Sequence, residues 1–160
     1  MEPRRRGPLV RLAETEAEAL GAHAVVRENA RMLGFVTRGA VVQKMLSRRL
    51  VVALGPAGEV EGCICFGVRR DQVATIYEIA AARAAAGRGV GSAMIAWFKE
   101  YLRARGKRAI RLKCTADNAA GNEFYRRQGF ELVAEERGRR RRLLVWHLGL
   151  GGGFSGRARR

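Results

Sequence analysis

The chain has 160 residues, 48% of them hydrophobic, which is enough for one domain with its own core. It carries 31 Lys and Arg against 15 Asp and Glu, a formal net charge of +16. The sequence contains no run of 18 uncharged apolar residues, and residues 1–8 lack the apolar stretch of a secretory signal. We therefore expect no membrane span, reduced cysteines and a cytoplasmic protein.

The hydrophobic pattern predicts an α+β domain over residues 9–148, between a basic, flexible N-terminus at 1–8 and a Gly/Arg-rich, disordered tail at 149–160. The predicted strands cover residues 9–12, 50–54, 59–68, 73–81, 108–114, 131–136 and 143–148. The predicted helices cover residues 15–32, 37–49, 91–105 and 118–128. A hairpin-rich first half followed by strand–helix alternation favours a mixed sheet over an all-parallel one.

Two local signals stand out along this order of elements. Thr15 and Glu18 have the spacing of a capping box, which predicts a helix start at that point. The turn Ala86-Gly87-Arg88-Gly89-Val90-Gly91-Ser92 lies between a predicted strand and an amphipathic helix. Glycines let the backbone approach a ligand, and helix N-termini present free N–H groups to anions, so the turn could cradle a pyrophosphate. Taken alone, the signal is weak, and a plain tight turn is the alternative.

A second motif follows in the segment Asn118-Ala119-Ala120-Gly121-Asn122-Glu123-Phe124-Tyr125-Arg126-Arg127-Gln128-Gly129-Phe130. In this order and spacing, the pair of motifs resembles the GCN5-related N-acetyltransferase (GNAT) superfamily. The resemblance implies a GNAT-like mixed sheet of about seven mostly antiparallel strands with a splayed central pair, flanked by about four helices. It covers residues 9–148. Three departures are Ala86, where the family commonly has Arg or Gln, Ala81, where Val is common, and Gly121, where Ala is common.

The resemblance implies an N-acetyltransferase that moves an acetyl group from acetyl-CoA directly to a primary amine in a ternary complex. By similarity, the backbone of Ile79, Ala80 and Ala81 holds the pantetheine. The turn formed by Gly87, Arg88, Gly89, Val90, Gly91 and Ser92 holds the pyrophosphate, with Arg88 replacing the charge missing at Ala86. Asn118 resembles the residue that fixes the following helix near the cofactor.

Two residues are candidates for the chemistry. Tyr125 corresponds to the family's usual general acid, which protonates the departing thiolate. A base is needed because an amine with a pKa of about 10.4 arrives protonated at neutral pH. Glu78 is the best candidate for it, because this residue interrupts an otherwise apolar strand. Three alternatives remain: Tyr125 as a half-buried structural residue, Glu78 as an edge-facing or salt-bridged carboxylate, and a chain of water molecules in place of a base. No metal is expected, since His23, His147 and Cys63-x-Cys65 do not form a ligand set.

The basic excess lies mainly at the two ends of the chain. Residues 1–8 hold three Arg and one Glu, and residues 137–160 hold eight Arg and no acidic residue. Such charge attracts polyanions, although charge runs are often only solvated surface. The expected partner is an amine acceptor, either a small molecule, a protein or an amine-bearing nucleic acid. The alternative is a nucleic-acid- or ribosome-directed protein that uses Arg137–Arg142 and the termini, and a homodimer is left open.

Overall fold

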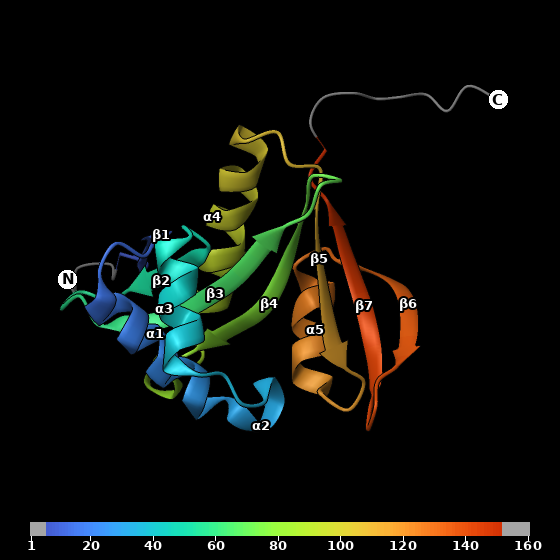
Figure 1. The fold of residues 1–160 in the computed structure, drawn as a ribbon, viewed down its shortest axis with the longest axis horizontal. Coiled ribbons are helices and arrows are strands. Elements are labelled where there is room, and N and C mark those ends of the chain that lie inside the picture. Colours follow the sequence, from blue (N-terminus) through green and yellow to red (C-terminus); the bar gives the residue numbers. More distant parts are fainter. Residues whose placement is uncertain (1–5, 152–160) are drawn as a thin grey trace, which may run out of the picture.

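The computed structural model describes residues 6–151, which form one seven-stranded sheet and five α-helices (Figure 1). The N-terminal elements are β1 (Leu9–Leu12), α1 (Glu16–Glu28), α2 (Ala30–Leu33), α3 (Arg38–Leu46), β2 (Leu50–Leu54), β3 (Val60–Val68) and β4 (Val73–Ala81). A 3-10 turn (Arg83–Ala85) precedes α4 (Val90–Ala104), β5 (Ala109–Thr115), α5 (Ala119–Arg127), β6 (Glu131–Arg137) and β7 (Arg142–Gly149).

The sheet has the strand order β1-β2-β3-β4-β5-β7-β6, and only β4 and β5 run parallel. This confirms the predicted mixed, mostly antiparallel sheet. The parallel pairing joins Val73–Ile76 to Ala109–Leu112 and then stops. Beyond it the two strands diverge, so the last five residues of β4 have no strand partner on the β5 side (Figure 1). The splayed central pair is therefore present.

Helices cover both faces of the sheet (Figure 1). Helices α1 and α3 pack over β2 and β3, where the core contains Ala22, Val26 and Val41 together with Cys63 and Cys65. Helix α4 covers the opposite face, and its Met94, Ile95, Phe98 and Leu102 are at most 1% exposed. The apolar side chains of α4 recur every three or four residues, which gives the helix one buried stripe.

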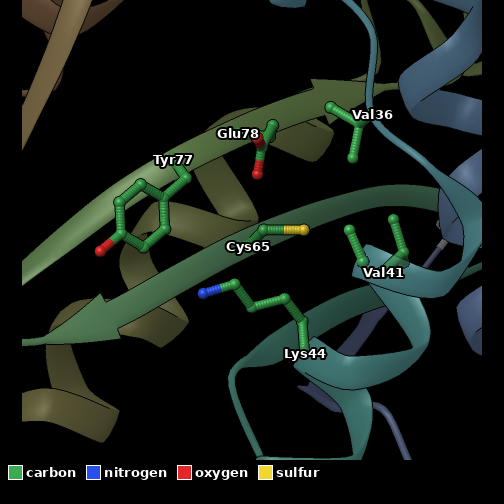
Figure 2. Close-up of a pocket in the computed structure, with 7 residues that line it drawn as sticks. Val36, Val41, Lys44, Cys65, Tyr77 and Glu78 are labelled. Carbon is green, nitrogen blue, oxygen red and sulfur yellow. The ribbon is translucent and has the colours of Figure 1, made fainter.

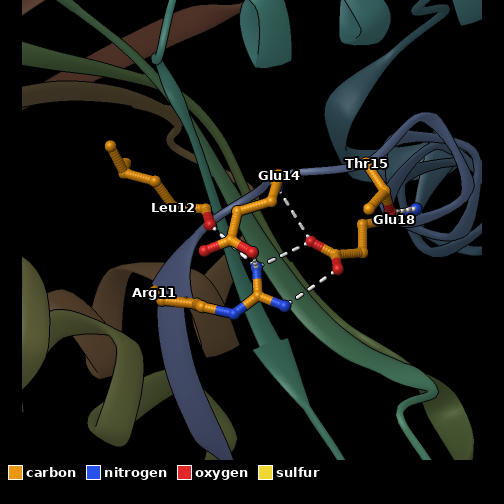
Figure 3. Close-up of polar contacts among 5 residues, drawn as sticks. All are labelled: Arg11, Leu12, Glu14, Thr15 and Glu18. Carbon is orange, nitrogen blue, oxygen red and sulfur yellow. Dashed lines mark hydrogen bonds and ion pairs between the residues drawn. The ribbon is translucent and has the colours of Figure 1, made fainter.

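The start of α1 follows the capping signal, with one addition (Figure 3). The Thr15 hydroxyl accepts a hydrogen bond from the Glu18 N–H at 3.1 Å, and the Glu18 carboxylate accepts from the Glu14 N–H at 2.9 Å. Arg11 of β1 donates to both carboxylate oxygens, at 2.8 and 2.9 Å. These contacts, led by the one with Arg11, lower the pKa of Glu18 from 4.5 to about 2.

The single helix predicted over residues 15–32 is divided at Asn29 into α1 and α2. The Asn29 side chain donates to the Val25 carbonyl at 2.9 Å and to the Ala81 carbonyl, at the end of β4, at 3.2 Å. Because asparagine bonds readily to nearby backbone groups, it favours helix ends over helix interiors. The break accounts for five helices where four were expected, and it places α2 beside the end of β4.

The folded region extends past the predicted boundary at residue 148. Gly149 belongs to β7, and Leu150 is 1% exposed and part of the main core. The Leu150 N–H donates to the Arg108 carbonyl, and its own carbonyl accepts from Arg103 at 2.8 Å. Residues 152–160 of the predicted tail and residues 1–5 lie outside the described residues. Between residues 6 and 151, no helix combines the length and apolar character needed to cross a membrane.

Candidate active site

A cleft of about 540 Å³ lies where β4 turns into α4 and faces the start of α5. It brings together all the predicted site residues except Glu78 and Arg88. The predicted residues that line it are Ile79, Ala80, Ala81, Gly87, Gly89, Val90, Gly91, Ser92, Asn118 and Tyr125. None of the described residues lining the cleft carries a charged side chain. An anion bound there would meet backbone N–H groups without a carboxylate to repel it.

The glycine turn has the backbone conformation that its residue types suggest. Gly87 and Gly89 both have φ of +75°, in the left-handed region that side chains with a Cβ disfavour. Gly89 is the N-cap residue of α4, and it has no side chain that could accept hydrogen bonds from the N–H groups of the first turn. The Ser92 hydroxyl accepts a hydrogen bond from the Gln128 side chain at 2.9 Å, which ties α4 to the end of α5. The turn therefore offers backbone donors at a helix N-terminus.

Arg88 faces away from the cleft. Its guanidinium lies 3.8 Å from the carboxylate of Glu61, a residue only 8% exposed, and it also donates to the Ala84 carbonyl. It lines a different cavity, beside Leu54 and Pro56. In this conformation Arg88 does not supply the charge that is missing at Ala86, so its role with a phosphate stays a prediction.

Helix α5 is positioned by three polar contacts. The Asn118 side chain accepts from the Gly121 N–H at 3.0 Å, and Asn122 donates to the Thr115 carbonyl at 3.0 Å. The Trp146 indole in turn donates to Asn122 at 2.9 Å. A Cβ on Gly121 would lie 2.5 Å from the Asn118 amide nitrogen, so in this conformation an alanine would push the capping side chain aside. The departure from alanine at position 121 therefore fits the local packing.

Tyr125 is 9% exposed and borders two cavities. Its ring meets Phe130 and Trp146 with centroid distances of 5.8 and 6.5 Å. It lines the 540 Å³ cleft and also a smaller cavity of about 150 Å³ between the diverging strands β4 and β5. Burial, together with the nearby Cys114, raises the pKa of the phenol above its usual value. Tyr125 therefore remains protonated near neutral pH, as a proton donor must.

Glu78 lies on the other face of β4, in an apolar pocket of about 240 Å³ shared with Cys65 and Lys44 (Figure 2). A bulge explains the local geometry: Cys65 pairs with Glu78 and Phe66 with Ile76, which leaves Tyr77 as the extra residue. Burial raises the pKa of Glu78, an effect partly offset by the Cys65 thiol and by the charge of Lys44. We call this the glutamate pocket. A carboxylate with a raised pKa can accept a proton at neutral pH.

Some residues that line the cleft were not predicted from the sequence. Met32 and Leu33 of α2 border both the cleft and the 150 Å³ cavity, and Asn29 and Phe124 complete the wall. The available signal was an asparagine inside an otherwise helical run, which marks a break. Nothing local in the sequence showed that the short helix after it would reach the end of β4.

Arg139, Arg140 and Arg141 lie in the connection between β6 and β7, where the cluster was predicted, and Arg142 is the first residue of β7. Two members of the cluster already have acidic neighbours: Arg141 lies 4.0 Å from Asp117, and Arg142 lies 3.7 Å from Glu135. None of the four lines the 540 Å³ cleft. Within residues 6–151, no group of three His, Cys, Asp or Glu side chains is placed to hold a metal ion.

The fold and the cleft together have the arrangement expected of an acyl-CoA-dependent acetyltransferase. Residues 43–130 match the model of the Acetyltransferase (GNAT) family, which is more than half of the chain, and the chain belongs to this family. The predicted family is thereby confirmed.

Two curated relatives match shorter segments. An uncharacterised N-acetyltransferase of Methanocaldococcus jannaschii is 39% identical over 64 residues, which are 40% of this chain and 28% of the relative. An uncharacterised N-acetyltransferase of Bacillus subtilis is 34% identical over 61 residues, which are 38% of this chain and 34% of the relative. The chain thus matches about a third or less of each relative's length.

Two solved structures show the same fold. The ribosomal-protein-S18-alanine N-acetyltransferase of Escherichia coli has a TM-score of 0.77 and 19% identity, covering 92% of this chain and 97% of that one. An acetyltransferase of Salmonella typhimurium, solved with acetyl-CoA, has a TM-score of 0.75 and 18% identity, covering 96% and 100%. These similarities confirm the predicted fold class.

Proposed function

We propose that this protein transfers an acetyl group from acetyl-CoA to a primary amine by direct attack in a ternary complex. The observation that carries the proposal is the cleft itself. It gathers the free edge of β4, the N-terminal turn of α4, Asn118 and Tyr125 around one uncharged cavity. Family membership supports the proposal, as does the similarity to a structure solved with acetyl-CoA.

The residues of the cleft fit the chemical parts of acetyl-CoA. The edge of β4 from Ile79 to Ala81, which has no strand partner on the β5 side, offers peptide groups to the amide-rich pantetheine arm. The N–H groups of the α4 first turn, near Gly87 and Gly89, suit the pyrophosphate. The co-substrate supplies an activated thioester carbonyl.

The two titratable groups act from opposite sides of the splayed strands. The Glu78 carboxylate takes a proton from the acceptor ammonium, directly or through water, because only the neutral amine is nucleophilic. Tyr125 donates its phenolic proton to the departing thiolate. Burial raises the pKa of both residues, so the Glu78 carboxylate binds a proton more readily and Tyr125 stays protonated near neutral pH.

Calorimetric titration with acetyl-CoA, followed by mass spectrometry of candidate amines, tests the proposal. We expect saturable binding of one acetyl-CoA per chain and a mass gain of one acetyl group on the acceptor. Lines that intersect in double-reciprocal plots are expected for a ternary complex. Parallel lines, together with an acetylated protein intermediate, would indicate a covalent mechanism instead.

The cleft indicates the chemical class of the acceptor less directly than it indicates acetyl-CoA. The Escherichia coli structure is named for a ribosomal-protein alanine, and a protein N-terminus is one amine that an open site between β4 and β5 could admit. We propose a protein or small-molecule amine in the cytoplasm as the acceptor. No specific observation favours the alternative of a nucleic-acid-associated protein, since two of the four arginines at the β6–β7 connection already have acidic neighbours.

A further inference from the structure

A second large cavity, of about 550 Å³, opens beside Tyr77 on the face of the sheet opposite α4. Strand β5 shows why it is basic. Ile110 and Leu112 are buried against the α4 side, whereas Arg111 and Lys113, which alternate with them, are exposed on the other face. Arg69, which directly follows β3, also lines this space. We call it the basic cavity, defined by Arg69, Arg111 and Lys113.

The charges of the basic cavity are only partly neutralised. The Lys113 ammonium lies 2.7 Å from the Glu136 carboxylate, so these two charges cancel. Neither Arg69 nor Arg111 forms an ion pair with any residue between 6 and 151. The residue opposite Arg111 on β7 is His147. Two guanidinium groups thus remain available, and guanidinium groups bind carboxylates and phosphates with paired hydrogen bonds.

The basic cavity is connected to the chemistry through Tyr77. This residue lines the glutamate pocket, the basic cavity and the 150 Å³ cavity between the diverging strands. The last of these shares Tyr125 with the acetyl-CoA cleft. A molecule whose amine reaches Tyr125 through the 150 Å³ cavity can therefore extend its next groups past Tyr77 into the basic cavity.

We propose that the basic cavity binds an anionic group, a carboxylate or a phosphate, carried by the acceptor close to its amine. This inference rests on the proposed function, because it assigns the acceptor of that reaction. Arg69 and Arg111 select acidic acceptors over neutral ones. The pair Lys113–Glu136 borders the cavity and keeps its net charge from rising further.

The first test measures binding of peptides by calorimetry in the presence of CoA. Three peptides with one free N-terminal amine and an amidated C-terminus differ only in their second residue, which is glutamate, glutamine or phosphoserine. We expect the two acidic peptides to bind about tenfold more tightly than the glutamine peptide at low salt. The difference should shrink in about 0.5 M salt, where the Debye length is only a few ångströms. The ratio between the glutamate and phosphoserine peptides distinguishes a carboxylate from a phosphate ligand.

The second test uses variants. Arg69→Gln and Arg111→Gln should each reduce the preference for acidic peptides by about threefold and leave binding of the glutamine peptide unchanged. Arg70→Gln is the matched control, because Arg70 is an exposed neighbour of Arg69 that does not line the cavity. Equal affinities for all three peptides, or a preference that survives in Arg69→Gln/Arg111→Gln but is lost when Arg139–Arg142 are replaced, would overturn the inference.

The two proposals can fail separately. If acetyl-CoA binds and neutral amines are acetylated while acidic peptides gain nothing, the inference about the basic cavity is wrong and the proposed function stands. If acetyl-CoA does not bind the cleft, the proposed function fails. The peptide titrations repeated without CoA then still measure whether the cavity holds anions.

Discussion

Replacing Tyr125 by phenylalanine removes one hydroxyl group and keeps the ring. The packing against Phe130 and Trp146 involves the ring alone, and the hydroxyl forms no hydrogen bond with any residue between 6 and 151. We therefore expect the free energy of unfolding to change by less than about 1 kcal/mol. If the hydroxyl is the general acid, turnover should fall about 10- to 10⁴-fold, which corresponds to roughly 1.4 to 5.5 kcal/mol of activation free energy.

A spectroscopic assay of CoA thiol release gives kcat and KM for Tyr125→Phe and the wild type, with calorimetric titration for acetyl-CoA binding. The dissociation constant for acetyl-CoA should be unchanged, because Tyr125 contributes a ring to the cleft wall in both proteins. Since burial raises the pKa of Tyr125 above its usual value, its deprotonation should produce no loss of activity below about pH 10. Wild-type kcat in the folded variant would show that water or another group protonates the thiolate.

Four further predictions concern other parts of the molecule. Gly89→Val should weaken acetyl-CoA binding more than about tenfold in a folded protein, whereas Gly89→Asn, which tolerates a positive φ, should retain it; unchanged affinity in the valine variant would contradict the assigned site. Glu78→Gln should lose most activity near neutral pH, where the carboxylate is charged and the acceptor amine is still protonated, and the loss should shrink at acid pH as Glu78 itself becomes protonated; an unaltered pH–rate profile would remove Glu78 from the mechanism. Because the folded-state pKa of Glu18 is depressed, its stabilisation is present at neutral pH and is lost as the pH falls from 4.5 toward about 2; Glu18→Gln should cost about 1–2 kcal/mol in denaturant unfolding at neutral pH and little at the acid end. Replacing Arg139–Arg142 with Ser should leave the KM for acetyl-CoA unchanged and flatten any salt dependence of polyanion binding. A loss of acetyl-CoA affinity alone would mean that the cluster lies beside the acetyl-CoA phosphates and not beside the acceptor.

The sequence predicted most elements because their signals are local. Glycines at 87 and 89 and an apolar stripe along α4 indicate a turn and a helix without reference to the rest of the chain. The capping signal of Thr15 and Glu18 was equally local, but the contribution of Arg11 depends on β1 lying beside the start of α1. Such a contact between separate elements leaves no mark in the sequence pattern.

The candidate site was also predicted only in part. Motif spacing located the cleft residues, including Asn118 and Tyr125, because the two motifs are contiguous segments. It did not show that Arg88 would pair with Glu61, or that a bulge at Tyr77 would put Glu78 in a separate pocket. Both results depend on which face of an element a side chain occupies, and a single extra residue in a strand changes that face.

The order of strands has a consequence for how the protein forms during synthesis. Strand β6 pairs only with β7, and β7 lies between β6 and β5 in the sheet. While residues 142–149 are still inside the ribosome, β6 has no neighbour and β5 is joined to the N-terminal strands by only four paired residues. Trp146, which holds α5 through Asn122, also belongs to this last strand. The wall of the cleft that carries Tyr125 is therefore completed only after nearly the whole described chain has emerged, whereas the wall formed by β4 and α4 can fold earlier.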